Sequence, residues 1–155
     1  MHKKPIKTIT LAMVMLVGIA YADTDPNNAI KYRKNIMSSV GGHTSAMVAI
    51  LKEEVPHTEA LKTHSAGLVA ATTPSVVLAA FMQNTDGEGS EETTATEKIW
   101  EDWARYEEAV NDLHAAAKEI QAAADSGSLT SFDQLKPALM QCGFCHRESG
   151  FRDKK

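Results

Sequence analysis

The sequence predicts an all-α protein folded as an antiparallel four-helix bundle, and three observations support this prediction. Apolar residues recur every three or four positions along most of the chain, which is the spacing of a helix that buries one face. The connections between these stretches are short, and no segment alternates apolar and polar residues as a half-buried strand does. Helices joined by short connections run antiparallel to their neighbours. The length of 155 residues suits one domain.

The N-terminal segment has the pattern of a secretory signal peptide. Three lysines precede an uncharged apolar run over residues 9–19, which is too short to span a bilayer comfortably. The run ends in Ala-Tyr-Ala at residues 20–22, the small-x-small pattern of a signal peptidase site. We therefore expect residues 1–22 to be removed on export, which leaves residues 23–155 as the folded domain. The alternative is an uncleaved membrane anchor.

The charge balance narrows the possible partners. Removing the three lysines of the signal lowers the formal net charge from -4 to -7. An acidic surface repels nucleic acid, so we expect no nucleic-acid partner. A basic protein surface would be attracted instead. No long apolar segment follows the signal, so no membrane span is expected after its removal.

The first two helical stretches are expected over residues 27–52 and 57–82. Pro26 fits the first turn of the first stretch, where no N–H is needed. Pro74 lies inside the second stretch and should kink or split it, because proline interrupts the helical hydrogen bonds. The expected core positions are Ile30, Met37, Val40, Met47, Val48 and Leu51 in the first stretch, and Leu61, Leu68, Val69, Val76, Val77 and Leu78 in the second.

Residues 83–97, QNTDGEGSEETTATE, are polar and contain glycine, which predicts a loop. Their acidic residues lack the ligand periodicity of a calcium-binding loop, so a solvated loop is the better interpretation. A third helix is expected over residues 98–125, ended by Gly127. Its core positions would be Trp100, Trp103, Tyr106, Val110, Leu113 and Ile120.

The fourth helix should begin at a serine cap, either Ser128 or Ser131. Pro137 should bend this helix about one turn before Cys142. Its apolar positions are Phe132, Leu135 and Leu139.

The only two cysteines of the chain lie in Cys142-Gly143-Phe144-Cys145-His146. Two thiols of an exported protein would ordinarily form a disulfide. A redox-active pair of this spacing normally opens a helix after a strand, and a structural zinc site would need a second pair of ligands. This chain offers neither. The remaining interpretation is covalent attachment of haem, for which the five-residue motif is the recognised sign.

The spacing of the motif suits this chemistry. Residues three apart share one face of a helix, so Cys142 and Cys145 can both reach the vinyl groups along one edge of a porphyrin. His146 follows directly and can bind the iron from the same side as the proximal ligand. We therefore expect one covalently bound haem c.

Together these features resemble the cytochrome c′ family, the class II c-type cytochromes. The resemblance covers the whole chain after the signal. It rests on Ile30-Lys31-Tyr32-Arg33 with Met37, on Ile99-Trp100 and on the terminal motif. It implies a bacterial periplasmic four-helix haem protein that is not an enzyme, and that pairs as a homodimer through its first two helices.

One segment departs from the family pattern. Members usually follow the haem histidine with two residues, then an aromatic residue and an arginine. Here Ser149 and Gly150 occupy those positions, and Phe151 and Arg152 come two residues later. The shift argues against a role for Arg152 beside the ring of His146.

The second axial position of the iron separates two functions. In the family, the position of Met37 holds leucine or phenylalanine in the five-coordinate, gas-binding branch, and an iron-binding methionine in the low-spin branch. The resemblance thus favours His146 and Met37 as axial ligands of an electron carrier. Such a carrier would serve redox proteins of the periplasmic or membrane electron-transport chain. If Met37 only packs in the core, the alternative is a high-spin protein that binds nitric oxide or carbon monoxide.

Arg33 lies one turn before Met37 and is suited to pairing with a haem propionate, with a solvated helix surface as the alternative. Rival distal ligands are Met47, His43, His57, His64 and His114. A peroxidase-like enzyme would need an acid-base histidine above the iron. His43 lies about 120° around the helix from Met37, off that face, which makes this the least favoured function.

Overall fold

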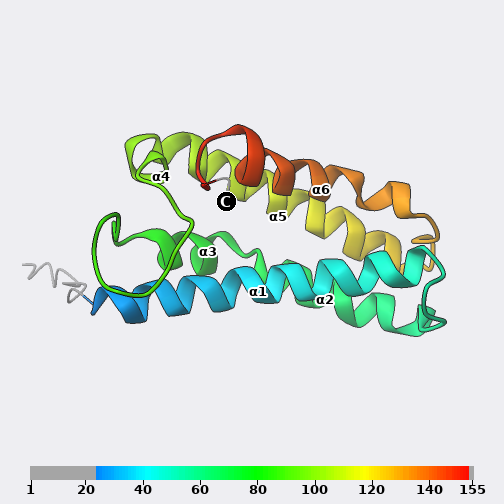
Figure 1. Ribbon diagram of the computed structural model, residues 1–155. Helices are drawn as coiled ribbons and strands as arrows, with labels where there is room; N and C mark the ends of the chain where they lie inside the picture. Colours follow the sequence, from blue (N-terminus) through cyan, green and yellow to red (C-terminus); the bar gives the residue numbers. More distant parts are fainter. Residues whose placement is uncertain (1–23, 154–155) are drawn as a thin grey trace, which may run out of the picture.

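The computed structural model describes residues 24–153 (Figure 1). The expected signal peptide, residues 1–22, lies outside the described residues. Its cleavage therefore remains a prediction. Within the described residues, no single helix is both long and apolar enough to cross a membrane. One bent pair, Thr58–Ala71 with Pro74–Phe81, reaches that length and apolarity only when its two helices are taken together.

Helix α1 spans Pro26–Leu51, within one residue of the stretch expected from the sequence. The carboxylate of Asp25 caps its start by accepting from the backbone N–H groups of Asn27 and Asn28. Such a cap typically stabilises a helix by about 1 kcal/mol. Pro26 occupies the first turn, where it removes no hydrogen bond.

The second helical stretch is split, as expected, at Pro74. A 3₁₀ turn at Thr58–Ala60 leads into α2, Leu61–Ala71, and α3 follows at Pro74–Phe81. The two parts are bent by 48°. The hydroxyl groups of Thr72 and Thr73 donate to the carbonyls of Leu68 and Val69 in the last turn of α2.

The third helix is interrupted, which the sequence prediction missed. A short helix, α4, covers Lys98–Glu101, and the long α5 begins separately at Trp103 and runs to Asp125. Asp102 separates the two helices because its backbone angles, φ -123° and ψ 56°, are not helical. Its carboxylate caps α5 by accepting from the N–H of Arg105. Gly127 follows α5 with φ +74°, a conformation that glycine adopts without strain.

Pro137 does not bend the last helix, and the prediction that it would is wrong. A 3₁₀ turn, Phe132–Leu135, comes first and is capped by Ser131, whose hydroxyl accepts from the N–H of Asp133 and whose own N–H donates to the side-chain oxygen of Gln134. Helix α6, Lys136–Gly143, then starts with Pro137 in its first turn, where proline is tolerated. A π-helical turn, η3, continues the chain at Phe144–Glu148.

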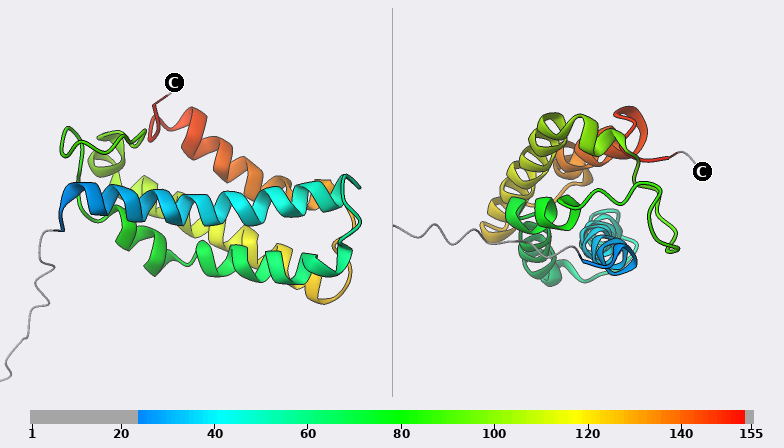
Figure 2. Two further views of the ribbon diagram at one scale, coloured as in Figure 1. Left: turned by 60° about the horizontal axis from the view of Figure 1, so that its bottom comes forward. Right: turned by 90° about the vertical axis from the view of Figure 1, so that its left-hand side faces the viewer.

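The elements form an antiparallel four-helix bundle in which α2 and α3 together make the second helix (Figures 1 and 2). Helix α1 packs against α2, α2 against α5, and α5 against α6, while α3 contacts both α1 and α5. The long loop between α3 and α4 passes beside the start of α1 (Figure 1). It is fixed there by the Asn27 side chain, which accepts from the N–H groups of Ser90 and Glu91.

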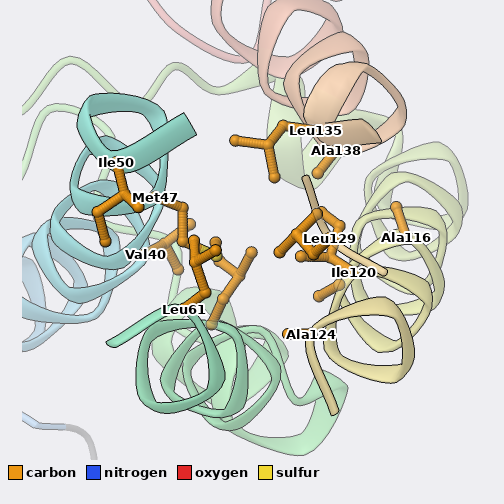
Figure 3. Close-up of a cluster of buried hydrophobic side chains, with 12 residues drawn as sticks. Val40, Met47, Ile50, Leu61, Ala116, Ile120, Ala124, Leu129, Leu135 and Ala138 are labelled. Carbon is orange, nitrogen blue, oxygen red and sulfur yellow. The ribbon is translucent and has the colours of Figure 1, made fainter. Parts of the chain in front are cut away.

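The core consists of two clusters along the bundle. The first, shown in Figure 3, joins α1, α2, α5, α6 and the 3₁₀ turn before α6. Met47 of α1, Ile120 of α5 and Leu135 of that turn are each at most 3% exposed. Burial of each such side chain is worth about 1.5–3 kcal/mol. The second cluster, called here the motif-side cluster, contains Val77, Ala80, Phe81, Ile99, Tyr106, Val110 and Phe151. It lies beside the C-terminal motif, whose Phe144 and Cys145 pack against it.

Candidate haem-binding site

The motif spans the end of α6 and the π-helical turn. Cys142 lies in the last turn of α6, and Cys145 and His146 lie in η3. The N–H of Ser149 donates to the carbonyl of Phe144 over 2.9 Å, a five-residue step that widens the turn. Single π-turns of this kind occur frequently at functional sites.

Both thiols are free and half-buried, so no disulfide joins them. Burial raises the pKa of Cys142, and burial together with the nearby Cys142 raises the pKa of Cys145 to about 11. The two groups are therefore neutral thiols at neutral pH. Neutral thiols three residues apart on a helical segment are the donor set that thioether attachment to two vinyl groups requires.

Met37 and Cys145 pack against the same cluster. Met37 comes from α1 and Cys145 from η3, and both contact the motif-side cluster as partly buried side chains. The other partly buried members are Ile36, Leu78, Ala95, Trp100, Trp103 and Phe144. The fold thus brings the expected distal residue and the attachment motif to one apolar region. Whether Met37 binds iron remains a prediction.

Arg33 is only 2% exposed, so the interpretation of this residue as part of a solvated helix surface is wrong. Its guanidinium lies over two aromatic rings, 4.6 Å from the centroid of Phe81 and 5.2 Å from that of Trp100. Its three hydrogen bonds go to Ala80 O at 3.2 Å, Thr85 Oγ1 at 3.1 Å and Gln83 O at 3.2 Å.

Burial lowers the pKa of Arg33, an effect that the neighbouring Tyr106 only partly opposes. No carboxylate within residues 24–153 forms an ion pair with this buried cation. A haem propionate would supply the missing negative charge, which is the role expected from the sequence. That role remains a prediction.

Arg152 reaches His146, contrary to the expectation from the two extra residues. Its Nη1 lies 3.1 Å from Nδ1 of the histidine, and its Nε donates to the hydroxyl of Thr94 over 3.1 Å. Gly150 makes this possible because it adopts φ +82° and reverses the chain. Phe151 then packs into the motif-side cluster at 3% exposure.

The segment after Gly150 is held by the loop before α4. Thr96 N–H donates to the carbonyl of Phe151, and Asp153 N–H donates to the carbonyl of Thr94. These bonds form a short antiparallel bridge between Ala95 and Arg152. The two extra residues, Ser149 and Gly150, are thus accommodated in a turn, and the side chain of Arg152 still reaches the ring of His146. Because the pairing involves a loop 58 positions away, no local sequence pattern predicts it.

His146 is exposed on its outer side. Partial desolvation, followed by the charges of Arg152 and Arg147, lowers its pKa. A lowered pKa favours neutral imidazole, the form that binds metal ions. The side chain is therefore suited to bind iron at neutral pH.

The rival histidines have other surroundings. Nδ1 of His43 faces Nδ1 of His64, and Nδ1 of His114 lies 3.3 Å from the hydroxyl of Thr72. His57 is exposed beside Glu59. Met47 is fully buried in the first cluster, away from the motif-side cluster. Met47 thus packs in the other cluster, and the four histidines contact one another, Thr72 or Glu59.

The family model for cytochrome c′ matches residues 28–152. The chain belongs to the cytochrome c′ family. It is 34% identical to a cytochrome c′ of Rhodopseudomonas palustris, over 99% of each chain.

Solved cytochromes c′ share the fold. The structure of the ferric protein from Alcaligenes xylosoxidans is 25% identical with a TM-score of 0.69, and the match covers 85% of this chain and 98% of that one. A ferrous variant from the same organism contains bound nitric oxide. That structure is 24% identical with a TM-score of 0.70, and the match covers 86% of this chain and all of that one.

Membership of the family identifies the cofactor as a single covalent haem c. The residues present fit this group. Two free thiols lie three positions apart, a histidine directly follows the second, and apolar side chains surround the attachment point. Cys142, Cys145 and His146 are the donors that would hold it.

Proposed function

We propose that this protein, with haem held by Cys142, Cys145 and His146, would bind nitric oxide or carbon monoxide at the iron in the apolar region that Met37 borders. The observation that carries the proposal is the apolar character of the motif-side cluster around Cys145. An apolar region can admit a small, weakly polar diatomic molecule without leaving polar groups unsatisfied. The naming of the relatives as cytochromes c′ and the nitric oxide bound to one of them support it.

Each residue has a defined part in this proposal. The thiols of Cys142 and Cys145 would hold the haem by thioether bonds, and Nε2 of His146 would bind the iron. Arg152, whose Nη1 lies 3.1 Å from Nδ1, would act on the imidazole through its charge and its packing, because arginine can only donate and a neutral imidazole bound through Nε2 carries its own proton on Nδ1. When bound, the haem supplies an iron whose affinity for diatomic gases depends on whether the second axial position is free.

Met37 would then be a packing residue that borders the gas site. Its flexible thioether side chain can move aside more easily than a branched residue. His43, the histidine nearest to Met37 on α1, contacts His64 of α2. This contact disfavours a peroxidase-like reaction, which needs a proton-transfer group beside the iron.

Electron transfer is the second candidate function, and the placement of Met37 favours it. Because the thioether lies in the same cluster as Cys145, it is close enough to the haem region to be considered as the sixth ligand. Two protein ligands would leave no place for a gas and would suit the iron to changes of oxidation state. The partners would then be redox proteins of the periplasmic or membrane electron-transport chain.

The cellular setting is also proposed. Removal of residues 1–22 would place the domain of residues 23–155 in the bacterial periplasm.

A homodimer through α1 and α2 is consistent with Gly41 and Gly42, which lie exposed on α1 with nothing within 4 Å of an added Cβ. These glycines leave room for close approach by a second copy.

The two functions differ in the optical spectra of the purified holoprotein. A gas-binding cytochrome c′ should show high-spin haem when oxidised and when reduced, and the reduced protein should bind carbon monoxide. A low-spin spectrum that carbon monoxide does not change would reject the proposal and support ligation by Met37.

A further inference from the structure

A pair of histidines joins α1 to α2 outside the haem region. Nδ1 of His43 lies 3.2 Å from Nδ1 of His64, and the ring centroids are 5.5 Å apart. Both side chains are half-buried. The proposed function uses neither residue. His43 lies six residues from Met37, about 9 Å along the helix axis.

The fold provides a slot for this pair. A Cβ added to Gly67 would lie 2.3 Å from Cε1 of His43 and 2.4 Å from its Nε2. No real side chain fits at that distance, so the absence of one at Gly67 allows the His43 ring to lie against α2. Gly67 is three residues after His64 and therefore on the same face of that helix. The glycine, the helix packing and the two rings together fix the arrangement.

The distance between the two nitrogens matches that of two ligands on one metal ion. Zinc binds imidazole nitrogen at about 2.0–2.1 Å. Two such bonds at the angles of square-planar or tetrahedral coordination place the nitrogens about 2.9–3.4 Å apart. The observed 3.2 Å lies within this interval, and without a metal it is the length of a hydrogen bond in which one Nδ1 donates and the other accepts. Metal binding through both Nδ1 atoms would move that proton to Nε2 of the donating ring.

We propose that His43 and His64 bind one divalent transition-metal ion through their Nδ1 atoms. Within residues 24–153 no third histidine, cysteine or carboxylate completes a cluster, so water would fill the remaining positions. Imidazole donors favour copper, zinc and nickel, and copper should bind most tightly of the three. Magnesium and calcium prefer oxygen ligands and should not bind.

Isothermal titration of the haem-loaded protein with zinc chloride, in a buffer free of chelators at pH 7.5, tests the proposal. We expect about one zinc ion per chain for the wild type and no binding heat with magnesium chloride. His43→Gln and His64→Gln should each weaken zinc binding by more than about tenfold, because even loss of a group that only orients a ligand costs 10–100-fold.

His57→Gln is the matched control. His57 is an exposed histidine 3.9 Å from Glu59, so it represents an adventitious surface site. Its substitution should leave the zinc affinity unchanged. Equal weakening by His57→Gln, unchanged binding in both paired variants, or no zinc binding by the wild type would each overturn the proposal.

Gly67→Ala tests the geometry without removing an imidazole. The added methyl group must displace the His43 ring. Zinc binding should weaken by at least about tenfold, while far-ultraviolet circular dichroism and the haem spectrum show the fold retained, because alanine is a better helix former than glycine. Unchanged zinc affinity in a folded Gly67→Ala protein would contradict the paired site.

Discussion

Replacement of Arg33 by methionine should destabilise the protein strongly. The substitution keeps a long side chain over the rings of Phe81 and Trp100 but removes the guanidinium. Three acceptors lose their donor in this variant. Two of them, Ala80 O and Thr85 Oγ1, belong to buried hydrogen bonds. Each buried group left without a partner costs about 1–3 kcal/mol.

The expected loss in the free energy of unfolding is about 3 kcal/mol. This value is below the largest loss expected for two buried acceptors without a partner, because folding of the variant no longer requires a charged side chain to be desolvated. It corresponds to a fall in melting temperature on the order of 10 °C for a domain of this size. Urea unfolding of the holoprotein, followed by far-ultraviolet circular dichroism, measures the change.

Lys34→Met is the matched control, since it removes the neighbouring cation from the same helix. Lys34 is exposed and pairs with Glu91 at 2.6 Å, and exposed pairs are worth about 0–1 kcal/mol. An Arg33→Met protein no less stable than Lys34→Met would refute the argument. Arg33→Lys should fall between the two, because one ammonium cannot reproduce the three bonds of the guanidinium fork.

The remaining predictions concern the haem site and the assembly. Cys145→Ala should retain haem through a single thioether, so acid-acetone should still leave colour on the polypeptide; complete extraction from the wild type would disprove covalent attachment. Arg152→Met should alter the haem spectrum or the reduction potential more than Arg147→Met, because only Arg152 contacts Nδ1 of His146. Equal effects would deny Arg152 a specific role beside the imidazole. Light scattering of the holoprotein should give the mass of a dimer at micromolar concentration, and a monomer mass throughout would exclude pairing through α1 and α2.

Most of the fold was predictable because its determinants are local. The apolar period located the helices, and Pro74 located the break between α2 and α3. Of the two serines expected as a cap, Ser128 and Ser131, it is Ser131 that caps the turn at the start of the last segment. The break before Trp103 was missed because Asp102 is compatible with a helix and acts as a cap only in this fold. The effect of Pro137 was predicted wrongly because the preceding turn is 3₁₀, which places the start of α6 at Lys136 and Pro137 in its first turn.

The haem site was predictable in its chemistry but not in its surroundings. The motif at residues 142–146 itself contains the expected donors, Cys142, Cys145 and His146. The family resemblance indicated Met37 and Arg33 as further site residues. The return of Arg152 to His146 could not be predicted, because it depends on the positive φ of Gly150 and on pairing with a distant loop. The His43–His64 pair depends likewise on how two helices are aligned along each other, which single-sequence periodicity does not determine.

Met37→Leu tests the central claim most directly, with the wild type measured beside it. Leucine keeps the size and apolar character of methionine, so the packing cost should stay below about 1.5 kcal/mol. If the distal face is open to gases, both proteins should show high-spin haem, and both should bind carbon monoxide when reduced. A wild type that is low-spin and a Met37→Leu variant that turns high-spin would contradict the account and identify Met37 as the sixth ligand.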